Sequence, residues 1–307
     1  MKKVFIDGSA GTTGLRIAER LASRPDLLLL RLPDDRRKDP EARRECLNQA
    51  DVAFLCLPDA AAVEAVALVE NPDTVIIDTS TAHRTAPGWT YGLPELEGQR
   101  EKIRLSRRVA NPGCHASGFI ALVAPLTAAG ILPRDAFLSC FSLTGYSGGG
   151  KKMIEGYRAA DRSGLFCAPR QYGLTQQHKH LPEMTALCGL EKPPAFCPIV
   201  ADFYSGMEVT VPLDAGALRG GAKDVREVLA ARYGGPVVRY VEDAGEAGFL
   251  SAAAFAGRDD MEIAVFGNED RILLTARFDN LGKGASGAAI QNMNIIMGVE
   301  ETTGLCL

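Results

Sequence analysis

The chain has 307 residues, of which 46% are hydrophobic and 23% are charged, and its formal net charge is −4. It is long enough for two domains and has the composition of a soluble globular protein. The negative charge argues against a nucleic-acid partner, and no apolar run approaches the roughly 20 residues that a membrane span needs. The start, MKKVFIDGSAG, has too few apolar residues for a signal peptide, so we expect a cytoplasmic protein.

The first third of the chain alternates apolar runs with helical patterns. The runs KKVFID, DLLLLRLP, DVAFLCLP and DTVIIDTS are typical of buried strands. The helices between them are marked by Leu15, Ala18 and Leu21, by the charged stretch 39–49, and by Val63, Val66 and Ala67. This alternation predicts a doubly wound α/β domain with a parallel sheet that is covered on both faces. Ligands of such sheets bind at the carboxyl ends of the strands.

The glycine-rich stretch GSAGTTG follows the first of these strands. Gly8, Gly11 and Gly14 would let the backbone approach a pyrophosphate, and the next helix would add N–H donors and a favourable dipole. The spacing is G-x-x-G-x-x-G and not the usual G-x-G-x-x-G, so a plain strand-to-helix turn is the alternative. Its place in the first of several alternating units favours a dinucleotide site.

The end of the second strand predicts which dinucleotide binds. A carboxylate there suits the ribose 2′-hydroxyl of NAD, and arginine suits the 2′-phosphate of NADP. The sequence LPDDRRKD offers both kinds of group. Arg36, Arg37 and Lys38 could surround a phosphate, although such a charged run could also be solvated surface. We predict NADP.

One cysteine stands out among the eight, which are scattered and form neither a C-x-x-C pair nor a zinc-ligand pattern with the four histidines. We therefore expect no metal site and treat most of the thiols as small core residues. Cys114, in NPGCHASG, precedes an apolar stripe formed by Phe119, Leu122, Val123 and Leu126.

Cys114 therefore lies at the start of a helix, where unpaired N–H groups and the dipole would lower the thiol pKa and favour the thiolate. We predict that it is a nucleophile. Pro125 should kink or stop the same helix.

A nucleophilic thiol needs a proton-transfer partner. The stretch TQQHKHLPEM holds His178 and His180, whose side chains would point the same way from an extended segment. One surface histidine and one hydrogen-bonded histidine would be the alternative. We predict that at least one of the two is functional.

Two further stretches are rich in glycine and polar residues. SLTGYSGGGKKM follows the strand-like FLSCF, and its open amides beside Lys151 and Lys152 would suit an anionic group, with a flexible hairpin loop as the alternative. Residues 279–298 end a strand and open a helix. The region before them contains MEVTVPL, MEIAVFG and RILLTARF, which alternate as strands do.

These motifs together resemble a known family, the N-acetyl-gamma-glutamyl-phosphate reductases of arginine biosynthesis, and in particular its shorter-chain (type 2) branch, which is related to aspartate-semialdehyde dehydrogenase. The matching segments run in order along nearly the whole chain. They are FIDGSAGTTGL, ADVAFLCLPD, DTSTAHR, YGLPEL, NPGCHASG, GYSGGGKKMI, HKHLPE and DNLGKGASGAAIQNMN. The cysteine, histidine and C-terminal segments make the resemblance specific.

The resemblance implies two domains. Residues 1–113 with 285–307 would form a Rossmann-type NADP-binding domain, and residues 114–284 would form an α+β catalytic and dimerisation domain with a mixed sheet. It also implies a homo-oligomer, either a dimer or a tetramer. The implied reaction is the NADPH-dependent reduction of an acyl phosphate, N-acetyl-gamma-glutamyl phosphate, to the semialdehyde through a cysteine thioester.

The resemblance and the motifs assign a set of site residues. The catalytic ones are Cys114, His178 and His180. The cofactor-binding ones are Gly8, Ser9, Ala10, Gly11, Thr12, Thr13, Gly14, Arg36, Arg37, Ser80, Asn280 and Gly282. The substrate-binding ones are Arg84, Tyr91, Ser147, Gly148 and Lys151.

Two other functions are consistent with parts of the sequence. A sister reductase acting on aspartyl phosphate or a carrier-bound aminoadipyl phosphate would share the cysteine, the histidine and the cofactor. A non-catalytic protein that senses a dinucleotide would share only the first domain and would leave the cysteine and histidine motifs unexplained.

Overall fold

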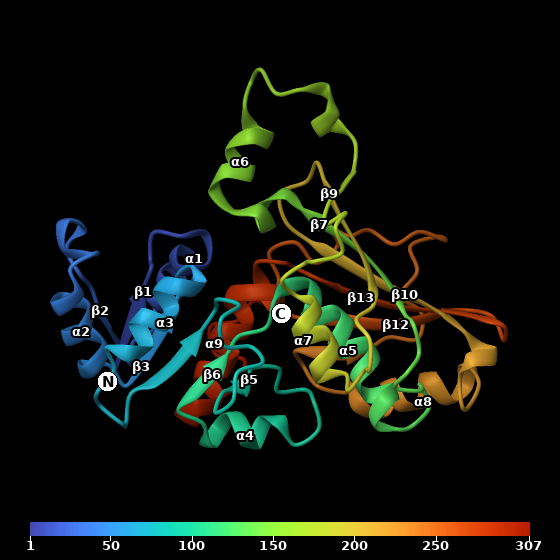
Figure 1. Cartoon of the computed structure of the whole chain (residues 1–307), viewed down its shortest axis with the longest axis horizontal. Helices are drawn as coiled ribbons and strands as arrows, with labels where there is room; N and C mark the ends of the chain where they lie inside the picture. The colour runs from blue at the N-terminus through green and yellow to red at the C-terminus, as the bar shows by residue number, and fades with distance from the viewer. The chain divides into compact units, whose positions relative to one another are not determined.

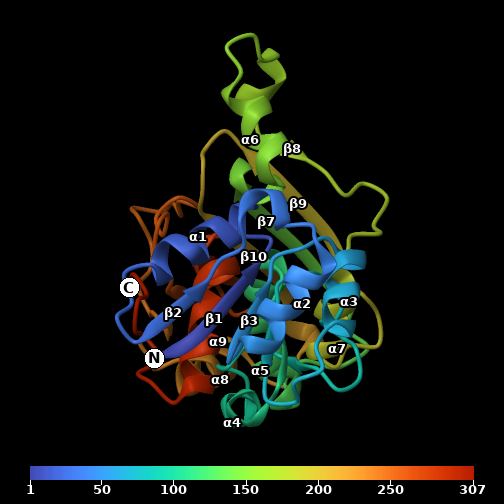
Figure 2. The same ribbon diagram turned by 90° about the vertical axis from the view of Figure 1, so that its left-hand side faces the viewer.

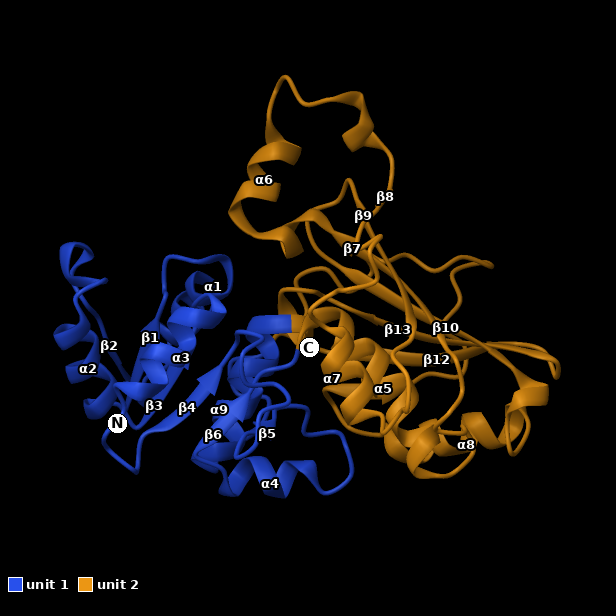
Figure 3. Cartoon of the chain, in the orientation of Figure 1, with its two compact units in different colours: residues 1–112, 285–305 blue, residues 113–284, 306–307 orange.

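The computed structural model describes residues 1–307, which form two compact units (Figure 3). Unit 1 comprises residues 1–112 and 285–305, and unit 2 comprises residues 113–284 and 306–307. Figure 1 follows the chain from the blue N-terminus to the red C-terminus. We expected Gly113 in the first domain, but it begins unit 2. We also expected residues 306–307 in the first domain. They group with unit 2 because the Asp259 N–H donates to the Cys306 carbonyl (2.6 Å), while the Cys306 N–H donates to the Asp259 carboxylate (2.8 Å).

Unit 1 is built on a six-stranded parallel sheet of order β2-β1-β3-β4-β6-β5. The strands are β1 (Lys2–Asp7), β2 (Leu27–Leu30), β3 (Val52–Leu55), β4 (Val75–Asp78), β5 (Thr90–Tyr91) and β6 (Arg108–Ala110). The chain passes from β1 to its neighbour β2 and then returns to β3 on the other side of β1. The strand order therefore reverses at β1, which is where such sheets bind ligands.

Helices cover both faces of this sheet. They are α1 (Thr12–Leu21), α2 (Pro40–Gln49), α3 (Asp59–Ala67), α4 (Gln99–Leu105) and α9 (Gly287–Met297). Alternate residues of β1 enter two separate cores: Val4 and Ile6 pack with α1 and α9, and Phe5 packs with α2 and α3. Burial on both faces explains why the strands are continuously apolar, and the predicted doubly wound domain is confirmed.

Unit 2 contains a seven-stranded mixed sheet of order β11-β12-β13-β10-β7-β9-β8. The strands are β7 (Ser139–Gly145), β8 (Arg170–Gln171), β9 (Ala195–Ala201), β10 (Met207–Asp214), β11 (Val238–Tyr240), β12 (Met261–Gly267) and β13 (Arg271–Phe278). The pairs β7/β9 and β11/β12 are parallel and the others are antiparallel. The predicted α+β domain with a mixed sheet is thus confirmed.

The central helix of unit 2 is α5 (Cys114–Ala128), which packs against β10 and β13 and against the helices α7 (Leu181–Leu187) and α8 (Ala222–Arg232). Residues 115–126 of α5 are all buried, so this helix is covered on every side. We expected Pro125 to kink or stop it, but α5 continues to Ala128. The carbonyl of Ala121, which the missing N–H of Pro125 would have bound, accepts instead from the Tyr233 hydroxyl (2.6 Å).

Between β7 and β9 the chain leaves the sheet in an excursion that contains α6 (Gly150–Arg158). Figures 1 and 2 both show this excursion standing out from the end of the sheet that holds β7 and β9. Tyr146 stacks on Tyr157, with 4.7 Å between ring centroids, and the Arg170 guanidinium lies 3.9 Å from the Phe166 ring centroid. Residues 142–145 of the stretch SLTGYSGGGKKM end β7, and the rest forms helical turns that lead into α6, so the stretch is not a hairpin loop.

Short helical turns complete the structure. They are η1 (Asp34–Arg36), η2 (Tyr146–Gly149), η3 (Gly164–Cys167), η4 (Ala215–Ala217) and the π-helical η5 (Gly282–Ser286). None of the helices has both the length and the hydrophobicity to cross a membrane.

Candidate functional site

A pocket of about 710 Å³ lies in unit 1 beside the loop that follows β1. Gly8, Ser9 and Ala10 of the predicted glycine loop line it, whereas Gly11, Thr12, Thr13 and Gly14 form the N-cap and first turn of α1. Gly8 has a φ of +87°, and a side chain there would collide with the Cys56 carbonyl, so this position requires glycine. No side chain caps α1, which leaves its first N–H groups for phosphate oxygens.

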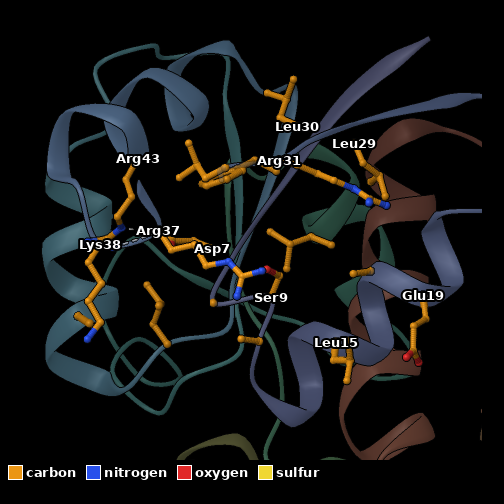
Figure 4. A pocket seen from close by; sticks show the side chains of 18 of the residues that line it. Asp7, Ser9, Leu15, Glu19, Leu29, Leu30, Arg31, Arg37, Lys38 and Arg43 are labelled. Atoms are coloured by element: carbon orange, nitrogen blue, oxygen red, sulfur yellow. Dashed lines mark hydrogen bonds and ion pairs between the residues drawn. The ribbon is translucent and has the colours of Figure 1, made fainter. Parts of the chain in front are cut away.

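Four cationic side chains line the same pocket: Arg31, Arg37, Lys38 and Arg43. In Figure 4 the labelled Lys38 and Arg43 lie on the left, opposite Leu15 and Glu19 of α1. We call these four side chains the cationic wall. Of the three cations predicted after β2, Arg37 and Lys38 belong to it, and the binding of a phosphate there stays a prediction. Arg31 and Arg43 were not predicted, because they lie outside the run of three cations at residues 36–38.

The cations of this wall and the neighbouring Arg36 differ in their partners. Arg37 pairs with the exposed Asp34 (2.6 Å). Arg36 pairs with Asp39 (3.0 Å) and does not line the pocket. Arg43 donates twice to the buried Asp7 carboxylate, from Nε (3.0 Å) and Nη2 (2.8 Å). Burial raises the pKa of Asp7, and the bonds from Arg43 partly offset that rise. Arg43 therefore neutralises a carboxylate that would otherwise repel a phosphate.

The other predicted residues of unit 1 are buried and lie outside the pocket lining. Ser80 follows β4, where its N–H and its hydroxyl donate to the Asp78 carboxylate (2.9 and 2.7 Å). The Arg84 Nε donates to the Asn111 carbonyl (3.1 Å), just after β6. Tyr91 is part of β5. Ser80 and Arg84 thus lie at the carboxyl edge of the sheet, and their ligand roles stay predictions.

Cys114 is the first residue of α5 in unit 2 and is half-buried. Its N-cap, Gly113, provides no side-chain cap, so the first-turn N–H groups have no side-chain acceptor there. The segment η5 passes beside the thiol. A Cβ built on Gly284 would lie 2.9 Å from the Cys114 Cβ and 3.1 Å from the Asp279 carbonyl oxygen, so only glycine leaves the cysteine undisturbed.

The neighbours of Gly284 add two facts about η5. Gly282, predicted to bind the cofactor, has a packing reason to be glycine because a side chain there would collide with the Arg258 carbonyl. Lys283 is fully buried, which is rare for a lysine. Lys283 was not predicted, because one lysine between two glycines carries no signal of burial.

A cluster of imidazole rings lies at the start of α5. The His115 ring centroid is 5.8 Å from that of His178 and 5.5 Å from that of His180, and the last two are 4.7 Å apart. The rings of His178 and His180 therefore lie together, as predicted, but on a turn and not on an extended segment, since the Leu181 N–H donates to the His178 carbonyl (3.0 Å). The His180 N–H donates to the His178 Nδ1 (3.3 Å). Glu183 of α7 accepts from the Gly113 N–H (3.2 Å) and ties the histidine segment to the turn before Cys114.

Two residues of this region, His115 and Tyr172, were not predicted from the sequence. His115 is buried, and its two ring nitrogens lie 2.6 Å from the Ser142 Oγ and 2.7 Å from the Tyr172 hydroxyl. His115 stands in the same short stretch as Cys114, so its position next to a nucleophile could have drawn attention. Tyr172 has no local signal, because only the fold brings it to α5.

Some of the remaining predicted residues of unit 2 lie close to one another. The Asn280 Nδ2 donates to the Ser147 Oγ (3.0 Å), and Gly148 packs close to the same amide. A cofactor residue and a substrate residue of the prediction therefore adjoin. Lys151 lies in the first turn of α6 and is exposed.

Comparison with known proteins assigns the family. The model of the semialdehyde dehydrogenase NAD binding domain matches residues 3–106, and that of the semialdehyde dehydrogenase dimerisation domain matches residues 114–280. N-acetyl-gamma-glutamyl-phosphate reductase 2 of Pseudomonas putida is 46% identical over 98% of both chains. The protein of the same name from Nostoc sp. is 45% identical over 99% of both. The chain belongs to the N-acetyl-gamma-glutamyl-phosphate reductase family.

The solved structures agree on the fold. Aspartate semialdehyde dehydrogenase II from Vibrio cholerae superposes with a TM-score of 0.72 at 15% identity, over 97% of this chain and 98% of that one. The family resemblance drawn from the motifs is confirmed. Membership also establishes that unit 1 takes a nicotinamide dinucleotide and that unit 2 is of the kind that mediates self-association.

Proposed function

We propose that this protein is an oxidoreductase of arginine biosynthesis, which reduces N-acetyl-gamma-glutamyl phosphate to N-acetylglutamate semialdehyde with NADPH and releases phosphate. One observation carries the proposal. Cys114 is the first residue of α5 and lies beside Gly284 and the cluster of His115, His178 and His180, in a chain that is 46% identical to a reductase of that name. Unit 1 would bind the cofactor, and unit 2 would carry the chemistry and the contacts of a dimer or tetramer.

The first half of the reaction belongs to Cys114. Its thiolate attacks the carbonyl carbon of the acyl phosphate, the new C–S bond forms, and the C–O bond to phosphate breaks. The helix N-terminus stabilises negative charge, first on the sulfur and then on the tetrahedral oxyanion, because its N–H groups and dipole are fixed in place. The product of this half is a thioester on Cys114 and free phosphate.

The second half reduces the thioester. A bound nicotinamide supplies the hydride. The oxyanion on the resulting carbon is held by the same first-turn N–H groups of α5. As the C–S bond breaks, the aldehyde forms and the sulfur leaves as thiolate. His178 or His180 takes the proton of the Cys114 thiol before the attack, as a general base, and returns a proton to the sulfur when the aldehyde leaves, as a general acid.

The residues of unit 1 fit NADP. The glycine loop and the N-terminus of α1 suit the pyrophosphate, and Arg37 and Lys38, joined by Arg31, suit the 2′-phosphate. Arg36, Ser80, Asn280 and Gly282 are further proposed contacts of the cofactor. Arg84, Tyr91, Ser147, Gly148 and Lys151 are the proposed contacts of the anionic substrate, since arginine and lysine suit phosphate and carboxylate groups.

The test is the reverse reaction in purified protein. We expect phosphate-dependent reduction of NADP⁺ with N-acetylglutamate semialdehyde, and much slower reduction with aspartate semialdehyde. Faster turnover of another semialdehyde would assign the protein to a sister reaction. Cofactor binding without any turnover would assign it to dinucleotide sensing and overturn the proposal.

A further inference from the structure

His115 is the centre of a buried hydrogen-bond chain that the proposed mechanism does not use. Its Nδ1 lies 2.6 Å from the Ser142 Oγ on β7, and its Nε2 lies 2.7 Å from the Tyr172 hydroxyl. His115 is 3% exposed and Ser142 is fully buried. Side chains from three separate parts of unit 2 therefore form one hydrogen-bond chain, Ser142–His115–Tyr172. Its central residue follows Cys114 directly in the sequence.

The ring of His115 is neutral. Burial, joined by the charge of His178, lowers the pKa of His115 to about 3. A neutral imidazole has one N–H donor and one acceptor nitrogen, so the two hydroxyls cannot play the same role. Either Ser142 accepts from Nδ1–H and Tyr172 donates to Nε2, or Ser142 donates to Nδ1 and Tyr172 accepts from Nε2–H.

Burial of Ser142 decides between these arrangements. His115 is the only hydrogen-bond partner of the Ser142 hydroxyl. If Nδ1 carried the proton, the Ser142 O–H would be a buried donor without an acceptor, which folded proteins avoid. If Ser142 donates to Nδ1, both ring nitrogens and the serine are satisfied. Tyr172 is half-buried, so its own O–H can reach another acceptor.

We infer that Ser142 holds His115 in its Nε2–H form and that both are positioning residues for Tyr172. They turn the Tyr172 O–H away from the imidazole ring and toward the acyl group on Cys114. Tyr172 is then a hydrogen-bond donor to the reacting acyl oxygen. Tyr172 lies in the same cluster, because its ring centroid is 6.1 Å from that of His115 and 6.0 Å from that of His178. Burial raises the pKa of Tyr172, and the charge of Cys114 raises it further, so the hydroxyl keeps its proton. The role of Tyr172 rests on the proposed function, whereas the tautomer of His115 does not.

The tautomer can be measured without turnover. In protein labelled with ¹⁵N at histidine, the side-chain nitrogens report which ring nitrogen carries the proton, and His115→Gln assigns the signals. We expect His115 as a single Nε2–H form that does not titrate above pH 5. Ser142→Ala removes the donor to Nδ1 and should populate the Nδ1–H form, and Ser142→Thr should restore the single form. An Nδ1–H ring in the wild type overturns the inference.

Activity tests the consequence for Tyr172. We expect Tyr172→Phe to lower kcat about 10²-fold, as loss of one oxyanion donor does, with an unchanged KM for NADPH. Ser142→Ala should lower kcat about tenfold, the scale of one hydrogen bond, and Ser142→Thr should recover it. In the Tyr172→Phe background Ser142→Ala should add nothing. Ser139→Ala, on the same strand and without a bond to His115, is the matched control.

Two outcomes separate the inference from the proposed function. Additive losses for Ser142→Ala and Tyr172→Phe would show that the serine does not act through the tyrosine, and would overturn the inference. A wild-type protein that shows the Nε2–H form but no turnover would leave the hydrogen-bond chain in place and overturn the proposed function instead.

Discussion

The pocket of unit 1 takes its polar groups from the main chain of one loop and from four cations, of which Arg31, Arg37 and Lys38 are exposed and Arg43 is largely buried. All of the residues that line it lie between Phe5 and Ala61. The Cys114 site of unit 2 takes its groups from side chains on α5 and β7, after β8 and before α7. Most of these are buried, as His115, Ser142 and His180 are. The first site is local in the sequence, whereas the second exists only when distant segments fold together.

This difference predicts unequal sensitivity to mutation. Several N–H groups and cations share the binding of a dinucleotide, so the loss of one weakens affinity in part. A nucleophile or a proton carrier has no substitute, so its loss removes transition-state stabilisation that nothing else supplies. Substitutions in unit 2 should therefore change kcat, and substitutions in unit 1 should change the KM for the cofactor. The variants below test this contrast.

Cys114→Ser should have the largest effect. A serine hydroxyl at the start of α5 is far less ionised than a thiol, so we expect kcat to fall on the order of 10⁴-fold or more. Binding of NADPH, measured by fluorescence titration, should stay normal. Cys167→Ser, at an exposed cysteine of the same unit, is the control and should keep full activity. Substantial turnover by the Cys114→Ser variant would rule out a mechanism through a thioester on Cys114.

Replacement of the acid/base histidine comes next. We expect either His178→Asn or His180→Asn to lower kcat by about 10²–10⁴-fold with little change in the KM for NADPH. Steady-state kinetics of both single variants assigns the proton carrier. If both variants keep wild-type kcat, the imidazole cluster has only a structural role.

Gly284→Ala tests the packing of η5 on the nucleophile. The new methyl group would press on the Cys114 Cβ and the Asp279 carbonyl, at 2.9 and 3.1 Å. Because a displacement of about 1 Å in a reacting group can cost about 10²-fold, we expect a loss of kcat of that order. Gly164→Ala, where an added Cβ meets nothing within 4 Å, is the matched control. If kcat is unchanged in Gly284→Ala, then η5 can shift without displacing Cys114, and the packing of η5 does not position the nucleophile.

The smallest effects should come from the cationic wall of unit 1. Loss of one charge-assisted bond to the 2′-phosphate should raise the KM for NADPH about ten- to a hundredfold in Arg37→Ala or Lys38→Ala, without affecting NADH. Arg36→Ala should have less effect, because Arg36 pairs with Asp39 outside the pocket lining. Equal use of NADH and NADPH by the wild type would contradict the assignment of NADP.

The local features of the fold could be predicted from the sequence. The strands and helices of unit 1 follow from apolar periodicity, and the place of Cys114 follows from the Pro-Gly turn and the apolar stripe of α5. The continuation of α5 past Pro125 could not be predicted, because the Tyr233 hydroxyl that satisfies Ala121 comes from the end of another helix.

The same limit applies to the candidate sites. Arg36, Arg37 and Lys38 are equivalent in the sequence, and only the fold shows that Arg37 and Lys38 line the pocket whereas Arg36 does not. Ser142 and Tyr172 are ordinary strand and loop residues until β7 and the segment after β8 bring them to His115. Chemistry that depends on such long-range contacts has no local pattern to detect.

The cysteines show this limit as well. Burial raises the pKa of Cys56 to about 12 and also raises the pKa values of Cys140 and Cys188, as their apolar surroundings in the sequence indicated. Cys167 and Cys306 are exposed, contrary to that pattern. Access to solvent therefore does not single out Cys114 among the eight thiols, and its covalent role must be measured through the acyl group that it carries.

The most direct measurement mixes the protein with N-acetylglutamate semialdehyde and NADP⁺ in the absence of phosphate. The Cys114 thiolate would add to the aldehyde, hydride would pass to NADP⁺, and the thioester would have no phosphate to accept its acyl group. The account predicts a burst of about one NADPH for each active site. It also predicts an N-acetylglutamyl group that peptide mass spectrometry, after an acid quench, locates on Cys114. An unmodified Cys114 after such a burst, or the same burst from Cys114→Ser, would contradict it.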